Sequence, residues 1–96
     1  MADVSITHLD QGARGEYHAR VEGSDAIGRL TYKRQGDMVV ADHTLVPTEI
    51  GGRGVAAELV KALVNDARQF GFRIVPQCSY VEAAFRRHPE WADLRA

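Results

Sequence analysis

A glycine-rich stretch, Gly51-Gly52-Arg53-Gly54, stands between Pro47 and an apolar pattern of helical period. The first amides of a helix have no internal acceptors and carry the positive end of the helix dipole. Glycines let a ligand come close to the backbone, so a loop of this kind can hold a phosphate. Arg53 could add a charge-assisted hydrogen bond. The alternative interpretation is a turn that needs glycine dihedral angles and binds nothing.

Two familiar phosphate-binding motifs do not account for this stretch. A P-loop requires Gly-Lys followed by Ser or Thr, whereas Gly54 is followed by Val55 and Ala56. Residues 52–57 match the dinucleotide pattern GxGxxA, but that pattern opens a βαβ unit and is followed about 20 residues later by a carboxylate. The corresponding position, near Gln77, has no carboxylate. The sequence therefore argues against both motifs.

The single cysteine, Cys78, lies where a short apolar segment ends and a helical pattern begins. A helix N-terminus lowers the pKa of a thiol and makes the thiolate more available as a nucleophile or hydrogen-bonding partner. The alternative is a small buried apolar residue, as most free cysteines are. Tyr80, in the first turn after Cys78, is a second candidate acid, and its other interpretation is packing or exposure.

His43 lies on the most apolar predicted strand and could take a proton from an incoming ammonium group, through water if needed. The alternative is a half-exposed strand histidine. Neighbouring side chains of a strand point to opposite faces, so we expect Asp42 on the other face, where it cannot share this role. His8, His18 and His43 fall on separate predicted strands without ligand-like spacing, so the sequence predicts no metal site.

Turn residues divide the first half of the chain into four short segments. We predict strands at residues 3–8, 14–21, 26–34 and 38–46. Strands at this spacing indicate an antiparallel meander, and Pro47 ends the fourth strand.

The apolar period changes in the second half of the chain. It predicts an amphipathic helix over residues 54–70, with Gly71 in the left-handed position past its end. A short strand at residues 72–76 and a second helix at residues 80–88, ended by Pro89, complete the order β-β-β-β-α-β-α. This is an α+β fold with helices packed on a mostly antiparallel sheet.

Two local features refine the C-terminal part. Ser79 and Glu82 have the spacing of a capping box, with Ser79 as the N-cap of the second helix. Trp91 and Leu94 are expected to fold back onto the core, because leaving them in water would waste scarce apolar area.

The composition limits the classes of function. The 96 residues suit one domain spanning residues 1–96. Twelve basic against 13 acidic residues give a formal net charge of −1, without the basic field of a nonspecific nucleic-acid binder. No apolar run approaches a membrane span, the N-terminus lacks the plan of a signal peptide, and a single cysteine excludes an intramolecular disulfide. We expect a soluble cytoplasmic protein that binds neither nucleic acid nor membranes.

Three segments together are more specific than the glycine stretch alone. They are residues 45–55 (LVPTEIGGRGV), residues 74–81 (IVPQCSYV) and residues 87–91 (RHPEW). In this order they resemble the GCN5-related N-acetyltransferases (GNAT), and among these the very small single-domain subfamily. In that family a Gln/Arg-x-x-Gly-x-Gly/Ala loop between the fourth strand and a long helix binds the pyrophosphate of acyl-CoA. The resemblance runs from about residue 27 to the end of the chain.

The resemblance implies a minimal GNAT-like fold in which the fourth and fifth strands lie parallel and splay apart. Acetyl-CoA is the implied cofactor, and its pantetheine arm would pair with the backbone of Leu45 and Val46. The amides of five consecutive residues would hold the pyrophosphate: Gly51, Gly52, Arg53, Gly54 and Val55. Strand amides in the gap would polarise the thioester carbonyl, so that an amine attacks directly and expels the CoA thiolate. Cys78, His43 and Tyr80 are the candidate catalytic residues, and an acetyl-Cys78 intermediate is the less favoured variant.

Three departures from the family pattern bear on its function. Glu49 stands where the signature has Gln or Arg, so its side chain should turn away or cap the helix. Phe85 takes the place of the tyrosine that often protonates the leaving thiolate. Residues 1–35 leave no room for the two helices that usually form the acceptor wall, although a dimer could supply it.

The sequence thus predicts an acetyl-CoA-dependent N-acetyltransferase, a monomer or weak homodimer, that acts on an unidentified amine. The alternative is a module that binds CoA or acyl-CoA with little or no turnover. A third interpretation is an interaction domain whose glycine stretch is only a turn.

Overall fold

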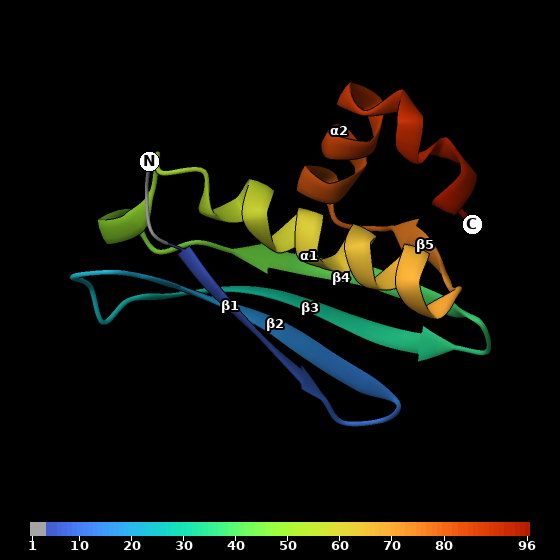
Figure 1. Ribbon diagram of the computed structural model, residues 1–96, viewed down its shortest axis with the longest axis horizontal. Coiled ribbons are helices and arrows are strands. Elements are labelled where there is room, and N and C mark those ends of the chain that lie inside the picture. Colours follow the sequence, from blue (N-terminus) through green and yellow to red (C-terminus); the bar gives the residue numbers. More distant parts are fainter. Residues whose placement is uncertain (1–3) are drawn as a thin grey trace.

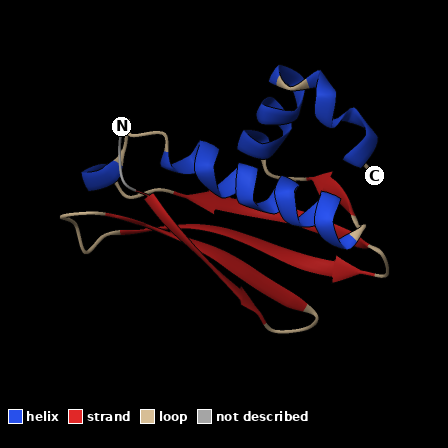
Figure 2. Ribbon diagram, viewed as in Figure 1, coloured by secondary structure: helices blue, strands red, loops and turns tan. Residues whose placement is uncertain are grey.

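The computed structural model describes residues 4–96. Its elements are β1 (Val4–Asp10), β2 (Arg14–Val21), β3 (Ile27–Gln35), β4 (Met38–Leu45), the 3-10 turn η1 (Thr48–Ile50), α1 (Val55–Phe70), β5 (Arg73–Pro76), α2 (Ser79–Arg87) and the 3-10 helix η2 (Pro89–Leu94). Five strands form one sheet, and the helices lie together on one side of it (Figures 1 and 2). The predicted α+β order is confirmed, while the expected start of the first strand at residue 3 lies outside the described residues.

The sheet has the order β1-β2-β3-β4-β5. The first three pairs are antiparallel, and β4 and β5 are parallel, joined by a crossover through α1. The parallel pair runs only from Met38–Ala41 against Arg73–Pro76. β4 then continues to Leu45, beyond the last residue of β5. The two strands therefore part after four paired residues.

One hydrophobic core fills the space between the sheet and the helices. The stripe predicted for α1 is buried in full: Val55, Leu59, Val60, Leu63, Val64 and Ala67. Alternate residues of the strands pack against this stripe from the sheet, among them Ala19, Leu30 and Ile74. A Cβ atom at Gly28 would lie 2.8 Å from Val55 Cγ1, so the missing side chain lets the start of α1 approach β3 closely. Between residues 4 and 96, no helix has the length and apolar character needed to pass through a bilayer.

Two buried tyrosines bring their hydroxyl groups to polar partners at the edge of this core. Tyr17 donates a hydrogen bond to Asp66 Oδ2 at 2.7 Å, and the Tyr32 hydroxyl lies 2.6 Å from His8 Nε2. Burial raises the pKa of both phenols above its ordinary value, so both remain protonated at neutral pH.

A β-bulge interrupts the ladder between β3 and β4. Thr31 pairs with His43 and Tyr32 with Ala41, so Asp42 is an extra residue without an opposite partner. Thr31 Oγ1 donates to Asp42 Oδ1 at 2.6 Å, which places Asp42 and His43 on the same face of the sheet. The prediction that they point to opposite faces is wrong, because a bulge shifts the alternation by one residue.

The C-terminal segment closes the far edge of the sheet. Trp91 and Leu94 are buried, as predicted, and the amide of Ala96 donates to the carbonyl of Ile74 at 2.8 Å. The predicted capping box is absent: Cys78 is the N-cap of α2, and no side chain caps that end.

Glu82 binds arginines instead of its own helix N-terminus. Its carboxylate contacts Arg95 Nη2 at 2.6 Å and Arg86 Nε at 3.3 Å. Arg95 is a charged partner, whereas a backbone amide is neutral, so the ion pair with the C-terminal tail competes with capping of the helix.

The Glu82–Arg95 pair makes a prediction for acid stability. The hydrogen bond from Arg95 holds the pKa of Glu82 below its ordinary value of 4.5. The stabilisation is therefore present above that value and is lost as the pH falls through the lower pKa of the folded state. We expect Arg95→Ala to lose less stability between pH 7 and pH 3 than the wild type does, as measured by urea midpoints. Arg20→Ala, which removes an exposed strand arginine, is the control, and equal pH dependence in all three proteins would contradict the prediction.

Candidate acyl-CoA site

At two positions of the glycine stretch, the backbone has a conformation that only glycine adopts easily. Gly52 has a φ of 75°, and Gly54, the N-cap of α1, has a φ of 74°. Residues other than glycine rarely adopt this left-handed backbone conformation. A Cβ atom at either position would meet nothing within 4 Å, so the loop presents bare backbone to open space.

The amides at the start of α1 are available to a ligand. The first hydrogen bond of the helix runs from the Glu58 amide to the Gly54 carbonyl at 3.1 Å. Within residues 4–96, no backbone or side-chain acceptor takes the amides from Gly52 to Ala57, and Glu49 does not cap them. Gly51 differs, because its amide donates to the carbonyl of Thr48 at 3.1 Å. The loop therefore offers an anion a row of unpaired N–H groups and the positive end of the helix dipole.

A pocket of about 570 Å³ opens in front of these amides. It lies between the end of β4, the loop and the first turn of α2. Its lining includes six of the predicted site residues: Val46, Gly51, Gly52, Gly54, Val55 and Tyr80. Thr48, Ala56 and Ala57 complete it, while Arg53 is exposed and does not line it. The structure thus brings most of the predicted cofactor residues into one place.

The parting of β4 and β5 leaves a second feature beside this pocket, which we call the β4–β5 gap. The gap begins just beyond the hydrogen bond that the Cys78 amide donates to the Ala41 carbonyl, at 2.9 Å. Beyond it, residues 42–45 of β4 face no strand on that side within the described part of the chain. Peptide groups of a strand that point away from its one neighbour remain free to bind a ligand.

Cys78 lies beside this gap, half-buried. Its Sγ atom is 3.5 Å from Thr44 Oγ1. Thr44 reaches it from the helix-covered face of β4, because the bulge brings Thr44 opposite the buried Leu30. Burial by itself raises the pKa of the thiol, but hydrogen bonds from the Thr44 hydroxyl and from the amides of Val81 and Tyr80 outweigh it. The thiol pKa therefore lies below its ordinary value.

The Thr44 hydroxyl makes a testable contribution to this thiol. We expect Thr44→Val to raise the pKa of Cys78, because the thiolate loses a hydrogen-bond donor while its burial is kept. The pH dependence of alkylation by iodoacetamide measures this directly, since Cys78 is the only cysteine. Thr44→Ser keeps the hydroxyl and should keep the wild-type profile. A valine variant with an unchanged profile would show that the hydroxyl does not stabilise the thiolate.

Of the other two predicted catalytic residues, Tyr80 lies in the first turn of α2, close to Cys78, whereas His43 lies on a different face of the sheet. His43 is exposed on the face of the sheet opposite the helices. Leu45, which is 54% exposed, pairs with Arg29 at the end of β4, so its side chain turns outward and only its backbone can serve the gap. Phe85 is buried with its ring edge-on to Trp91, at 5.6 Å between centroids. The tyrosine that α2 presents at the pocket is Tyr80.

Sequence reasoning missed Thr44 and the shared face of Asp42 and His43. Both follow from the bulge, which leaves no mark in the composition of β4. The order of residues carries one local signal of the change: three polar residues in succession, at positions 42–44, follow an apolar run.

The comparison with known protein families decides which class of protein this is. Residues 16–94 match the model of the family described as GCN5-related N-acetyl-transferase. The chain belongs to the GCN5-related N-acetyltransferase family. This confirms the resemblance found in the sequence, and it extends the match toward the N-terminus, into β2.

Membership of the GCN5-related N-acetyltransferase family classes the chain as an acyltransferase enzyme. A solution NMR structure of a GCN5-like protein from Staphylococcus aureus has a similar fold, with a TM-score of 0.70 and 24% sequence identity. The match covers 94% of this chain and 87% of the other, so the fold shared with that protein includes the short N-terminal half.

Proposed function

We propose that this protein is a single acyl-CoA-binding domain that transfers an acetyl group from acetyl-CoA to an amine. The observation that carries the proposal is the row of unpaired amides from Gly52 to Ala57, which lines a pocket beside the β4–β5 gap in a chain of the GCN5-related N-acetyltransferase family. The lone thiol and the absence of a bilayer-spanning helix in residues 4–96 fit a cytoplasmic site of action.

The residues of the loop and of β4 divide the binding between them. The amides of Gly52, Arg53, Gly54 and Val55 hold the pyrophosphate, with Gly51 shaping the turn before them. The backbone of Leu45 and Val46 lies along the pantetheine arm. Acetyl-CoA supplies an activated acyl group as a thioester.

The chemistry needs a polarised carbonyl and three proton movements. Free peptide N–H groups of residues 42–45 polarise the thioester carbonyl and stabilise the negative charge that forms on its oxygen. His43 takes a proton from the ammonium group, and the amine nitrogen then forms the new C–N bond. As the C–S bond breaks, the electron pair stays on sulfur, and Cys78 or Tyr80 donates a proton or a hydrogen bond to it. The nitrogen of the new amide releases its remaining extra proton to water. Direct attack by the amine is the favoured route, and an acetyl-Cys78 intermediate is the variant.

One observation favours the alternative of a binding module with little turnover. Phe85 is part of the core, so the position that the family gives to its acid carries no ionisable group. Tyr80 bears on this objection, since it brings a phenol to the lining of the pocket beside the β4–β5 gap. A measurable rate of acetyl transfer to an amine would distinguish an acetyltransferase from a binding module.

Gly52 provides the direct test of cofactor binding. A methyl group at Gly52 would project into the open space in front of the amides, so we expect Gly52→Ala to weaken acetyl-CoA binding about tenfold by isothermal titration calorimetry, or ~1.4 kcal/mol. Gly23→Ala is the matched control, because Gly23 also has a positive φ and an unobstructed Cβ direction but lies in the β2–β3 turn. Both variants should lose similar stability, about 1 kcal/mol.

The outcomes discriminate among the three interpretations. No heat from acetyl-CoA with the wild type would remove both the enzyme and the binding module. Binding without acetyl transfer to any amine would leave the module. Equal affinity of Gly52→Ala and Gly23→Ala would show that the loop does not hold the pyrophosphate.

A further inference from the structure

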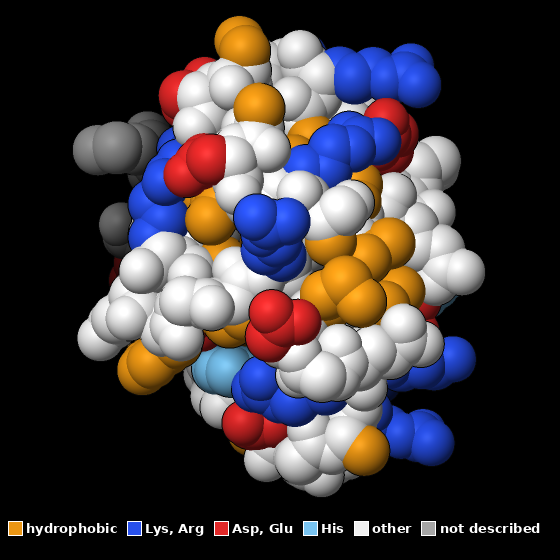
Figure 3. Space-filling view, turned by 90° about the vertical axis from the view of Figure 1, so that its right-hand side faces the viewer, with side chains coloured by type: hydrophobic (Ala, Val, Ile, Leu, Met, Phe, Trp, Pro, Cys, Tyr) orange, Lys and Arg blue, Asp and Glu red, His pale blue; other side chains and the backbone are white. Residues whose placement is uncertain are grey.

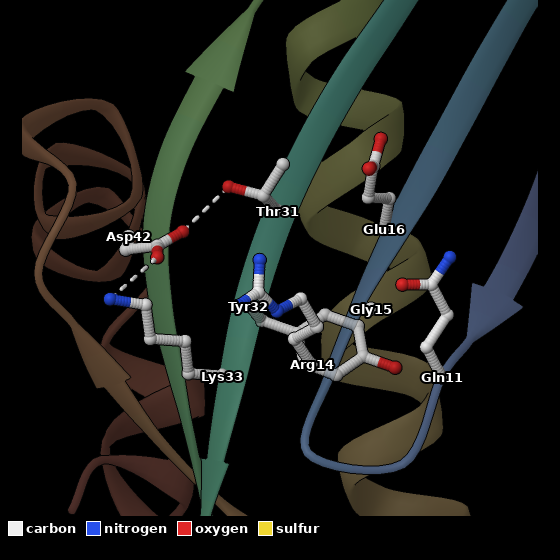
Figure 4. Close-up of a pocket in the computed structure, with 8 residues that line it drawn as sticks. All are labelled: Gln11, Arg14, Gly15, Glu16, Thr31, Tyr32, Lys33 and Asp42. Atoms are coloured by element: carbon white, nitrogen blue, oxygen red, sulfur yellow. Dashed lines mark hydrogen bonds and ion pairs between the residues drawn. The ribbon is translucent and has the colours of Figure 1, made fainter.

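The face of the sheet opposite α1 and α2 has no helix on it, and we call it the open face. Figure 4 views it directly, with α1 behind the strands. Its side chains come from alternate positions of three adjacent strands: Arg14, Glu16, His18 and Arg20 of β2, Arg29, Thr31 and Lys33 of β3, and Asp42 and His43 of β4. A polar face of this kind stays in water or meets a polar ligand.

Cations exceed anions on the open face. Glu16 pairs with His18 at 2.8 Å, and Asp42 accepts from Thr31 and lies 3.9 Å from Lys33 Nζ. Arg14, Arg20 and Arg29 have no carboxylate within 4.0 Å among residues 4–96. In Figure 3, seen from the right of Figure 1, Lys and Arg side chains project at the lower right, and others lie higher up, with Asp and Glu side chains among them. A simple cation approaching this face is therefore repelled, whereas an anionic group gains unpaired guanidinium donors.

The open face also has a hollow of about 190 Å³. In Figure 4, Lys33 and Asp42 lie together toward β4, Glu16 lies along β2, and the Arg14 side chain extends between them. The hollow can take the end of a small molecule that presents an anion to Arg14 and Lys33.

Asp42 connects this hollow with the β4–β5 gap, because it lines the hollow and is the first residue of β4 beyond the part paired with β5. Asp42 follows Ala41, whose carbonyl closes the gap against the Cys78 amide. The cofactor pocket and Tyr80 occupy the helix-covered side of the gap, so an amine reaches it from the open face, where the bulge places both Asp42 and His43. Adjacent strands lie about 4.8 Å apart, so β3 is about 5 Å from β4 at the start of the gap, and Lys33, opposite Val40, lies just before that point.

We propose that the acceptor is a small amine that also carries an anionic group, held on the open face with the anion between Arg14 and Lys33 and the ammonium group toward Asp42 and His43. This rests on the proposed acetyl transfer, and it names the class of acceptor. Polyamines and lysine-rich peptides are poor acceptors on this basis, because they bring only positive charge to a cationic face.

The first test measures acceptor binding without acetyl-CoA. We expect 5-aminopentanoate, whose chain is long enough to span the distance, to shift the amide resonances of Glu16, Thr31, Lys33 and Asp42 in a ¹⁵N-labelled sample. Pentylamine, of the same length without the carboxylate, and 1,5-diaminopentane should shift none of them. Arg14→Ala should abolish the shifts from 5-aminopentanoate. Absence of shifts in the wild type, or equal shifts from pentylamine, would overturn the proposal.

The second test measures transfer. With acetyl-CoA, the KM for 5-aminopentanoate should be at least about tenfold lower than that for pentylamine, a difference of ~1.4 kcal/mol. Arg14→Ala should raise that KM about tenfold with little change in kcat or in acetyl-CoA affinity, and Lys61→Ala, on the outer side of α1, should change neither. Preference for the diamine, or an unaltered KM in Arg14→Ala, would overturn the acceptor class while leaving acetyl-CoA binding intact. If the wild type did not bind acetyl-CoA, that result would instead contradict the proposed function.

Discussion

Replacing Trp91 by alanine is expected to destabilise the protein by about 3–5 kcal/mol. Trp91 is 8% exposed, its ring stacks on His88 at 4.0 Å between centroids, and Phe85 meets its face edge-on. Alanine would leave a cavity between α1, α2 and η2 that the short C-terminal segment cannot fill. A domain of this size has only about 5–15 kcal/mol of total stability, so a large share would be lost.

Urea denaturation followed by far-ultraviolet circular dichroism is the suitable measurement, because Trp91 is the only tryptophan and its fluorescence disappears with it. Phe70→Ala is the matched control, since Phe70 is 70% exposed and its removal should cost less than about 1 kcal/mol. A loss below about 1 kcal/mol for Trp91→Ala would mean that the tail does not contribute to the core as its burial indicates.

Replacing Cys78 by alanine is expected to lower the rate of acetyl transfer about a hundredfold, the lower end of what a positioned proton donor contributes. The half-buried thiol lies beside the β4–β5 gap with a lowered pKa, which suits it to exchange a proton or hydrogen bond with a leaving sulfur. The affinity for acetyl-CoA should change by less than about twofold, because the loop amides do not involve this side chain.

Initial rates by product mass spectrometry, together with calorimetric titration of acetyl-CoA, separate these effects. Cys78→Ser should retain more activity than Cys78→Ala, since a hydroxyl can still donate a hydrogen bond. Direct attack also predicts no acetylated protein when the wild type is incubated with acetyl-CoA alone. Equal rates for all three proteins would assign Cys78 to packing, and transfer the role of proton donor to Tyr80.

Much of the fold could be predicted because its signals are local. Strands of period 2 between turn residues and a helix of period 3.6 each depend on about ten neighbouring residues. The predicted helix end at Gly71 is confirmed by its left-handed conformation, and Pro89 stands at the first position of η2, just past the end of α2. The loop between Pro47 and Val55 could be assigned for the same reason, since glycine dihedrals and free helix amides are properties of one short segment.

The sequence by itself therefore determined the order of elements, the glycine loop before α1 and the family. Only the tertiary structure decided that Asp42 and His43 share the open face, that Thr44 meets Cys78, and that Glu82 binds Arg95 in place of its own helix N-terminus. The physical reason is that each of these depends on a partner far along the chain. A bulge is a relation between two paired strands, and an ion pair forms with whichever charge the fold brings nearest, so neither can be seen in one segment alone.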